Sequence, residues 1–595
     1  MIPITQVWLV FTLMCLGAGY VIYHTVCKLA KPTPDSSMRS ASIFSIYLMG
    51  LCWIVLVLQI YNLFLPVNIG LKWFVWGLSG LGTLGLCNSL WSILKKKMGW
   101  FQIISGIAFL ALSVVMCSYR ATFSIWFEDT WLYHQKAVRW ISEYPAVFGL
   151  VNLDFRLGLV SSVHLLAALQ ESVINPVLQH KYISAAHLIT GSVTYIFFAK
   201  WLHTILADFK ESRLVRVYCL FSLTLIIHYI FGAPGRLLAS LNTDIVMDLS
   251  LLGLCKEMLS LPKGFWKIKK EEEWLDASWH YLMIIMLGIT LLTMKSNSMF
   301  TGILSTLLII PVLIGFIKSE PKYHKKLSLS LVLLLIGPSM LGLGLLARNV
   351  IITGWMIFPF PYLGNLGLDW SISEYRVNFR YHDAMNWGRR FKGADYSKLN
   401  DFTYWFWPWL KSAIHSRTFQ LIIFGLTAIG ITLIKPIKKH FWDKDWLQRV
   451  APLFVAFIGL SFIILTSAHL RYAQAYIWAF FAIAAAILTS RLPLVVNIAL
   501  VIGLAVYTDN YQYFRHLHPI NLTGVYPSFR APINRFTPNK NMPMHMPEKR
   551  GLCGNHPPQI LCTPDPDSKL ELRVSGNLRY GFKSTCDKLW CGWRE

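Results

Sequence analysis

The chain has 595 residues, of which 55% are hydrophobic and only 14% are charged, and its mean hydropathy is +0.48. Soluble proteins usually carry about 25% charged residues, so this composition excludes an ordinary soluble domain. The net charge is +25, but many of the basic residues lie in short segments between apolar runs. That distribution argues against nucleic acid as a partner and favours membrane lipids.

Apolar runs of about 18 residues or more recur along the chain, as required for helices that cross a hydrocarbon core of about 30 Å. Residues 1–118 hold four of these runs. The first, at 8–26, lacks the basic start and the small-residue cleavage site of a signal peptide. Further runs follow within 182–346 and 418–507. The sequence therefore predicts an all-α polytopic membrane protein with about 14 transmembrane helices.

Lysine and arginine gather in alternate loops between these runs, as in the Lys-Lys-Lys segment at 95–97. The positive-inside rule places such loops in the cytoplasm. Residues 157–175 are apolar enough to cross the membrane, but a span there would move the later basic loops outside. We therefore predict a re-entrant or interfacial helix for that stretch. The loops 119–181 and 347–417, the tail 508–595 and both termini then face the extracytoplasmic side.

The tail contains four of the eleven cysteines, and the other seven lie in or beside apolar runs. An even number of cysteines in a polar, proline-rich, extracytoplasmic segment predicts two disulfides formed in an oxidising compartment. A zinc site is the alternative, but no CxxC spacing supports it. The three pairings of four cysteines stay open. The disulfide candidates are Cys553, Cys562, Cys586 and Cys591.

The first outer loop carries an acidic pair, Glu128-Asp129, within the segment FEDTWLYHQKAVRW. On a helix, Tyr133 at i+4 would share the face of Asp129, and His134 would follow it. A carboxylate at the mouth of a membrane cavity is suited to act as a general base, because burial raises its pKa while nearby cations keep it ionised. We predict Asp129, Glu128 and His134 as catalytic candidates, and Tyr133 and Arg156 as substrate contacts. The alternative is a solvated interfacial helix with an acidic N-terminal cap.

Ionisable groups also lie at the outer ends of several predicted spans. Arg348 and Asn349 begin the second outer loop, and an arginine there could bind a phosphate or extend to lipid headgroups. Asp244, Lys295 and Arg471 lie in three other outer turns. Their common side of the membrane predicts a shared cavity for an anionic, lipid-linked substrate. There is no P-loop, GxGxxG, HExxH or GxSxG motif in the sequence, which disfavours ATP-driven transport, nicotinamide chemistry, zinc proteolysis and α/β-hydrolase chemistry.

With these residues identified, the chain resembles the membrane glycosyltransferases of the GT-C fold, and more closely a bacterial group of GT-C-like integral membrane proteins. That group shows a D-T-x-L-Y-H-like segment, a G-L-x-N-L-x-x-R-L stretch, an R-N-x-I-x-x-G segment and a terminal P-C-T-P…G-F-K block. Here these motifs occupy 129–134, 149–157, 348–354 and 561–583. The resemblance extends from about residue 115 to residue 583.

This resemblance implies transfer of a sugar from a polyprenyl-phosphate donor to a cell-envelope glycan, lipid or protein acceptor, at the outer face of a bacterial cytoplasmic membrane. Asp129 or Glu128 would deprotonate the acceptor, while Lys295, Arg348 and Arg471 stabilise the departing lipid phosphate. In some GT-C enzymes a metal bridges the acidic motif and the phosphate, so a divalent metal is the cofactor to test for. The acidic loop follows the fourth apolar run here, whereas in the classical enzymes it follows the first.

Two other functions stay open. An O-antigen-type polymerase or ligase relies on arginines more than on an acidic motif, so substitutions of Asp129 and Arg348 would separate it from a GT-C enzyme. A flippase or transporter of lipid-linked saccharides would need charged residues near the middle of its spans, together with internal repeats. Most charges here lie at the ends of predicted spans, and no repeat is evident.

Overall fold

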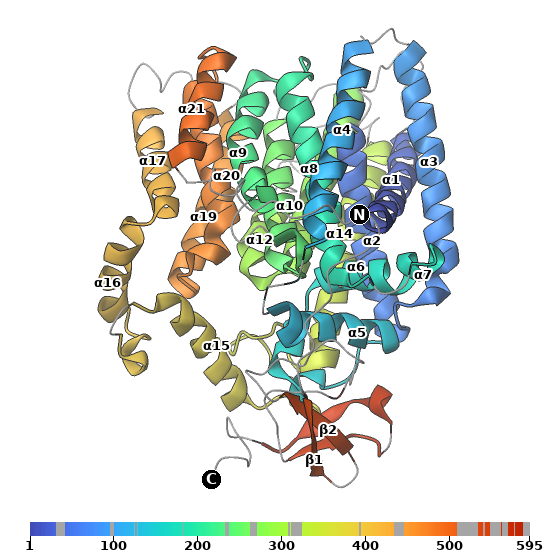
Figure 1. The fold of residues 1–595 in the computed structure, drawn as a ribbon, viewed down its shortest axis with the longest axis vertical. Coiled ribbons are helices and arrows are strands. Elements are labelled where there is room, and N and C mark those ends of the chain that lie inside the picture. Colours follow the sequence, from blue (N-terminus) through green and yellow to red (C-terminus); the bar gives the residue numbers. More distant parts are fainter. Residues whose placement is uncertain are drawn as a thin grey trace.

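Long helices make up most of the described chain and run roughly side by side through the upper part of the molecule in Figure 1. The computed structural model describes residues 1–30, 42–95, 100–123, 125, 127, 129–180, 183–231, 237–261, 271–307, 310, 324–391, 394–432, 446–507, 533–539, 542–547, 561, 569–575 and 577–586. The long helices are α1 (Ile2–Ala30), α2 (Ile43–Phe64), α3 (Lys72–Lys95), α4 (Trp100–Ala121), α8 (Ile189–Leu206), α9 (Arg213–Phe231), α10 (Thr243–Leu259), α11 (Glu271–Met294), α12 (Met299–Leu307), α14 (His324–Thr353), α17 (Arg417–Thr432), α19 (Trp446–Thr466), α20 (Leu470–Thr489) and α21 (Leu494–Tyr507).

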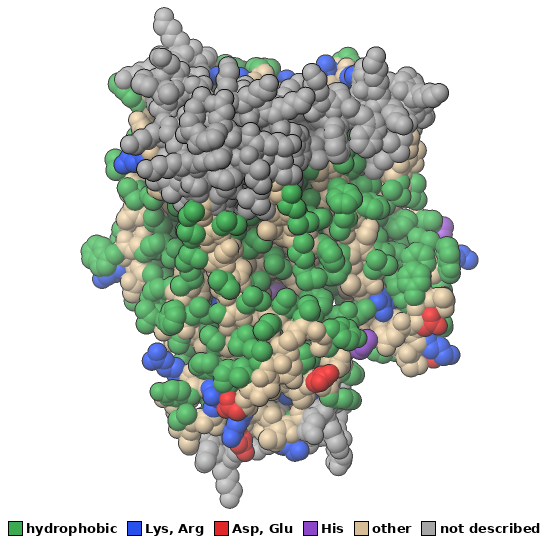
Figure 2. All heavy atoms as spheres, turned by 180° about the vertical axis from the view of Figure 1, so that it is seen from behind, with side chains coloured by type: hydrophobic (Ala, Val, Ile, Leu, Met, Phe, Trp, Pro, Cys, Tyr) green, Lys and Arg blue, Asp and Glu red, His purple; other side chains and the backbone are tan. Residues whose placement is uncertain are grey.

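Six helices in the described part of the chain are long and apolar enough to cross a membrane: Ile2–Lys28, Ile43–Phe64, Trp100–Ala121, Arg213–Phe231, Leu335–Thr353 and Leu470–Thr489. Large hydrophobic side chains stay exposed on α3 and α4, among them Trp73 at 74% and Trp100 at 70%. In Figure 2, hydrophobic side chains cover the middle of the molecule. An apolar surface of that extent needs lipid or another apolar partner to cover it. The chain is therefore largely helical with membrane-spanning character, as its composition predicts.

The first three helices pack closely through glycines. A Cβ added to Gly17 of α1 would lie 1.9 Å from the carbonyl oxygen of Leu78 in α3, and a Cβ added to Gly50 of α2 would lie 1.6 Å from that of Cys15. Both distances are far shorter than a van der Waals contact. Small residues at such points allow helix backbones to approach each other closely, as is common between membrane helices.

The first outer loop folds into short helical elements below the long helices (Figure 1). They are η2 (Thr130–His134), α5 (Gln135–Glu143), η3 (Leu150–Asn152), η4 (Phe155–Gly158), α6 (Ser162–Leu169), η5 (Gln170–Ile174) and α7 (Asn175–Val177). Asn62 of α2 holds the loop in place. Its backbone carbonyl oxygen accepts a hydrogen bond from Ala146 N at 2.7 Å, and its side-chain amide donates one to Tyr144 O at 3.2 Å. Over 157–175, every residue of which is described, α6 (8 residues) continues without a break into η5 (5 residues) and α7 (3 residues), so the helical stretch has 16 residues, fewer than the about 20 of a typical span. The structure thus forms no helix of spanning length there.

The second outer loop contains α15 (Glu374–Arg389), η11 (Tyr396–Lys398) and α16 (Phe402–Ile414). The other short elements are η1 (Ile69–Leu71), η6 (Ala185–His187), η7 (Leu237–Ala239), η9 (Ser296–Ser298) and η13 (Leu578–Tyr580).

The tail forms strands that the sequence did not predict. β1 (Ile533–Asn539) pairs antiparallel with β2 (Met542–Pro547), and β3 (Leu570–Leu572) pairs antiparallel with β4 (Phe582–Ser584). The tail therefore departs from the all-α expectation. β3 and β4 have only three residues each, too few for an alternating pattern to predict, and β1 and β2 contain prolines, which argue against a strand.

Strand β4 attaches the tail to the first outer loop. Phe582 N donates a hydrogen bond to Phe148 O at 2.9 Å. The preceding Gly581 has φ +85°, and a Cβ there would lie 1.8 Å from Phe148 O, so a glycine is required. Leu570 and Phe582 also share a buried core with Trp140. Cys586 is disulfide-bonded, whereas Cys553, Cys562 and Cys591 lie outside the described residues.

Candidate functional site

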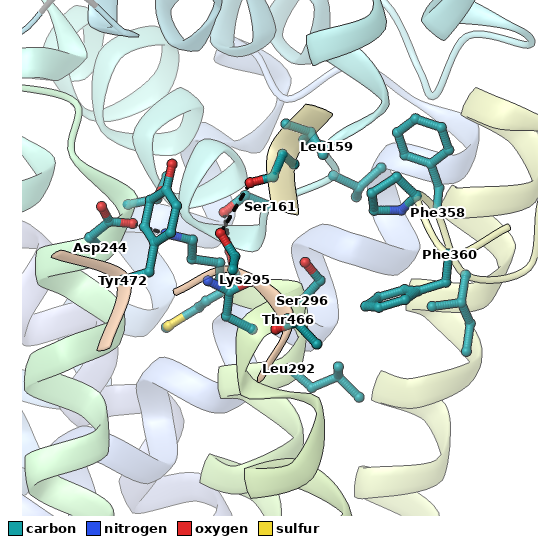
Figure 3. A pocket seen from close by; sticks show the side chains of 18 of the residues that line it. Leu159, Ser161, Asp244, Leu292, Lys295, Ser296, Phe358, Phe360, Thr466 and Tyr472 are labelled. Carbon is teal, nitrogen blue, oxygen red and sulfur yellow. Dashed lines mark hydrogen bonds and ion pairs between the residues drawn. The ribbon is translucent and has the colours of Figure 1, made fainter. Parts of the chain in front are cut away.

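A cavity of about 240 Å³ lies where the first outer loop meets the outer ends of α10, α11, α14 and α20. Its walls differ in chemistry. Asp244, Lys295 and Tyr472 lie on one side in Figure 3, and Phe358 and Phe360 lie on the other. The cavity can therefore hold a ligand that has one charged part and one apolar part.

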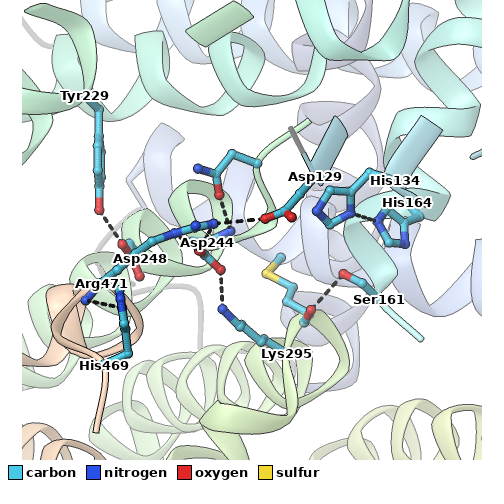
Figure 4. Close-up of polar contacts among 12 residues, drawn as sticks. Asp129, His134, Ser161, His164, Tyr229, Asp244, Asp248, Lys295, His469 and Arg471 are labelled. Atoms are coloured by element: carbon cyan, nitrogen blue, oxygen red, sulfur yellow. Dashed lines mark hydrogen bonds and ion pairs between the residues drawn. The ribbon is translucent and has the colours of Figure 1, made fainter. Parts of the chain in front are cut away.

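The charged wall is an ion-pair network in which Arg471 bridges two carboxylates (Figure 4). Its Nη2 lies 3.1 Å from Asp244 Oδ2 and 3.5 Å from Asp129 Oδ2. The other oxygen of Asp244 accepts a hydrogen bond from Lys295 Nζ. Lys295 Nζ also lies 4.2 Å from the centre of the Tyr472 ring, a cation–π distance. Two cations and two carboxylates from distant parts of the sequence thus meet in one cavity.

Helix termini position these groups. Asp244 is in the first turn of α10, where Asn242 Oδ1 accepts a hydrogen bond from Asp244 N at 2.9 Å. Arg471 is in the first turn of α20, where His469 Nδ1 accepts a hydrogen bond from Arg471 N at 3.3 Å. Lys295 directly follows the last residue of α11. A helix N-terminus carries partial positive charge, so α10 and α20 both favour anions on this side of the molecule.

Asp129 precedes a π-helical turn. The turn η2 covers Thr130–His134 and closes with a hydrogen bond from Gln135 N to Thr130 O, one residue wider than in an α-helix. Thr130 Oγ1 accepts a hydrogen bond from Leu241 N at 3.2 Å, which ties the turn to the segment before α10. Tyr133 and His134 both line the cavity. The sequence predicted an α-helical turn there, and the wider turn explains how two consecutive residues reach the cavity.

Burial dominates the electrostatics of this turn. It raises the pKa of Asp129 above its ordinary value, Arg471 opposes that rise, and Asp244 adds to it. Burial and the nearby His164 hold the pKa of His134 well below its ordinary value, and the pKa of His164 is lowered to about 3. The two rings are linked by a 2.6 Å contact from His134 Nδ1 to His164 Nε2, so one neutral imidazole donates and the other accepts. Among these three groups, only Asp129 has a raised pKa, and a raised pKa makes its carboxylate a stronger base.

Most of the predicted site residues lie together. The cavity is lined by Asp129, Tyr133, His134, Asp244, Lys295, Asn349 and Arg471. Glu128 lies outside the described residues.

Two predicted substrate contacts lie outside this cavity. Arg156 does not line it; its Nη1 lies 3.5 Å from Asp154 Oδ1, and Asp154 also pairs with Lys136. Arg156 therefore belongs to the polar network that supports the loop. Arg348 lines a second, smaller cavity instead, so the predicted convergence of three cations holds for only two. Successive residues on a helix point about 100° apart, and it is the neighbouring Asn349 that faces the main cavity.

The sequence did not predict that Tyr472 and His164 line the cavity, or that Phe358 and Phe360 form its aromatic wall. Tyr472 follows Arg471 directly, which was an available signal. Phe358 and Phe360 come from a proline-rich segment in which Phe358-Pro359 is a cis peptide bond. An aromatic residue in such a segment is equally consistent with a membrane interface, so composition alone could not assign it to a cavity.

The donor set for a divalent metal can be tested on the described residues. Asp129 and Asp244 both direct an oxygen at the Arg471 guanidinium. No group of three or more His, Cys, Asp or Glu side chains in the described part of the chain could hold a metal ion. Glu128, the other member of the acidic pair that a metal would bridge, is not among the residues searched.

Comparison with known proteins adds one family. A model of the family described as a domain of unknown function (DUF8201) matches residues 1–478, which include every residue that lines the main cavity. No curated protein and no solved structure matches the chain.

Proposed function

Because the chain belongs to the family described as a domain of unknown function (DUF8201), whose description names no activity, we propose a function from the cavity itself. On this proposal the protein is a GT-C-type membrane glycosyltransferase with about 14 transmembrane helices. It moves a sugar from a polyprenyl-phosphate donor to a glycan, lipid or protein of the bacterial cell envelope. The supporting observation is that a partly buried carboxylate of raised pKa, Asp129, whose side chain is 36% exposed, shares one cavity with Lys295 and Arg471.

The proposed reaction breaks the bond between the anomeric carbon and the phosphate oxygen and forms a bond from that carbon to an acceptor hydroxyl oxygen. The bonding electron pair leaves with the polyprenyl phosphate. Asp129 takes the proton from the acceptor hydroxyl, as a general base does. Lys295 and Arg471 stabilise the negative charge that develops on the leaving phosphate. Both cations contact Asp244, so the phosphate would share them with that carboxylate.

The apolar side of the cavity suits the lipid part of such a donor. Phe358, Phe360, Leu292, Leu345 and Phe462 all line it. Isoprene units have no hydrogen-bonding groups, and burying them against aromatic and aliphatic side chains is favourable in proportion to the apolar area covered. A water-soluble sugar nucleotide has no lipid chain that could pack against these side chains.

The direct test is donor cleavage by the purified protein in lipid vesicles. Vesicles with polyprenyl-phosphate sugars and envelope extract should release polyprenyl phosphate and form a glycosylated product, both visible by mass spectrometry. The variant Glu143→Gln is a matched control, because Glu143 is an exposed carboxylate of the same loop that does not line the cavity. Passage of intact lipid-linked saccharide across the bilayer without cleavage would make the protein a transporter instead.

We expect opposite pH shifts from two substitutions in the network. The base must be ionised, so activity falls as pH drops through the pKa of Asp129. Arg471 lowers that pKa, so Arg471→Gln should move the acidic limb of the kcat/KM profile to higher pH. Asp244 raises it, so Asp244→Asn should move the same limb to lower pH. Shifts in the same direction, or an acidic limb that stays in place, would contradict the assignment of Asp129.

We also propose that the cavity opens to the extracytoplasmic side of the bacterial cytoplasmic membrane. Cys586 then lies outside, consistent with its disulfide. In spheroplasts, a membrane-impermeant maleimide should label the peptide that contains Cys586, and only after a reductant is added. Labelling that requires lysis would place the tail in the cytoplasm and reverse the orientation.

A further inference from the structure

A second cavity, of about 30 Å³, adjoins the main one. The two share Leu159, Val160, Ser161 and His164 as walls. The rest of the smaller cavity comes from the end of α2, from α5 and later parts of the first outer loop, and from α14, which contributes Arg348. A water molecule needs about 10–15 Å³ of such space, so the smaller cavity has room for about two atoms of that size.

Arg348 has no counter-ion among the described residues that line this cavity. The residue is 3% exposed, and its Nε and Nη1 have no hydrogen-bond partner among the described residues. Two buried lysines are paired with carboxylates: Lys136 contacts Asp154, and Lys256 contacts Glu257. The buried Arg389 donates to the carbonyl oxygens of Leu399 and Leu465 instead. A buried charge without a partner is strongly unfavourable, and ionisable groups of this kind within membrane proteins usually mark a functional site.

A second donor belongs to another residue that lines the same cavity. Trp140 lines it, is 2% exposed, and its Nε1 has no hydrogen-bond partner in the described part of the chain. Buried indole N–H groups usually find an acceptor. Water could accept these hydrogen bonds but would leave the charge of Arg348 uncompensated. An oxyanion satisfies both requirements at once, and a guanidinium is well suited to bind one.

We infer that the smaller cavity binds an oxyanion group, a phosphate or a carboxylate, of the substrate that occupies the main cavity. The space for about two water-sized atoms matches two oxygens of such a group. This inference rests on the proposed function and extends it: the reacting substrates carry a second anionic group besides the phosphate at Lys295 and Arg471. That group is either a second phosphate of the lipid donor or an acidic group of the acceptor sugar.

The donors of Arg348 and Trp140 should make the site selective for substrates that carry the oxyanion. A substrate that brings the oxyanion satisfies Arg348 and Trp140, whereas a neutral analogue leaves both groups buried and unpaired. A site that is built to hydrogen-bond a substrate group discriminates strongly against analogues that lack it.

The test uses the full-length protein in lipid nanodiscs and four probes. The first pair is geranyl phosphate and geranyl diphosphate. The second pair is galacturonate and galactose, added with saturating geranyl phosphate. The measured quantity is the binding affinity for each probe. In one of the two pairs, the wild type should bind the more anionic probe about 10- to 100-fold more tightly, as expected for a hydrogen bond to a charged group. Preference in the first pair identifies the donor as the source of the oxyanion, and preference in the second identifies the acceptor.

Arg348→Gln should abolish that preference and leave the affinity for geranyl phosphate unchanged. Arg139→Gln should change neither, because Arg139 is a half-buried arginine of α5 that lines neither cavity. Arg348→Met should also raise the melting temperature, because it removes an uncompensated buried charge. A wild type without preference in either pair, or a preference that survives Arg348→Gln, overturns the inference. Failure of the wild type to bind geranyl phosphate, or normal binding by Arg471→Gln, would instead count against the proposed function.

Discussion

The variant Asp129→Asn is expected to transfer sugar about 10²- to 10⁴-fold more slowly than the wild type, the range typical for loss of a general base. Asparagine has nearly the same shape and can still accept a hydrogen bond from Arg471, whose Nη2 lies 3.5 Å from Asp129 Oδ2. It cannot take up the proton of the acceptor hydroxyl. Single-turnover rates in vesicles measure the effect, and binding of geranyl phosphate should be largely retained.

A different outcome would move the role to another group. Near wild-type turnover by well-folded Asp129→Asn would point to His134 or Glu128, and each can be tested by the same assay. If those substitutions were also silent, the acidic segment would be an interfacial cap and the proposed reaction would lose its base. Glu143→Gln, which changes an exposed carboxylate of the same loop, should leave the rate unaltered throughout.

Asp154→Ala is expected to lower the free energy of unfolding by about 3–5 kcal/mol, the usual effect of removing one partner from a buried ion pair. The side chains of Lys136 and Asp154 are 5% and 0% exposed, so the variant removes a carboxylate that pairs with a buried ammonium group. Asp154 also accepts a hydrogen bond from Arg156 N at 3.0 Å at the start of η4. Thermal unfolding in detergent measures the loss.

The double variant Lys136→Met, Asp154→Leu provides the control. It replaces both charges with apolar groups of similar size, and such replacements are often neutral or stabilising. It should therefore recover much of the stability that Asp154→Ala loses. A double variant as unstable as the single one would mean that the hydrogen bond from Arg156 N to Asp154, and not the lost ion pair, dominates.

The sequence predicted the helical architecture and much of the site for physical reasons that are local. A helix that crosses the hydrocarbon core of a membrane must be long and apolar. Charged residues are costly within that core, so they lie mostly at the ends of such helices. The sidedness of the loops then placed Asp244, Lys295 and Arg471 near one another, and the structure brings them into contact.

The errors arise where the answer depends on helical phase or on packing. Arg348 and Asn349 are adjacent in the sequence, and only the rotation of α14 decides which of them faces the main cavity. Arg156 is directed to Asp154 by the fold of η4, which no periodicity reveals. Strand β4 depends on a contact with Phe148 in the distant first loop. Tertiary contacts of this kind override local propensity.

The attachment of the tail to Phe148 has a consequence for biosynthesis. Phe582 and Phe148 are about 430 residues apart, so a ribosome that adds about 5–20 residues per second needs on the order of 20–90 s to make the second after the first. During that interval the first loop lacks the cover that Leu570 and Phe582 give to Trp140 in the finished protein. A chain that ends before residue 569 never acquires it. We therefore expect the acidic loop to reach its final form only when translation is complete, so that prematurely terminated chains stay inactive in the membrane.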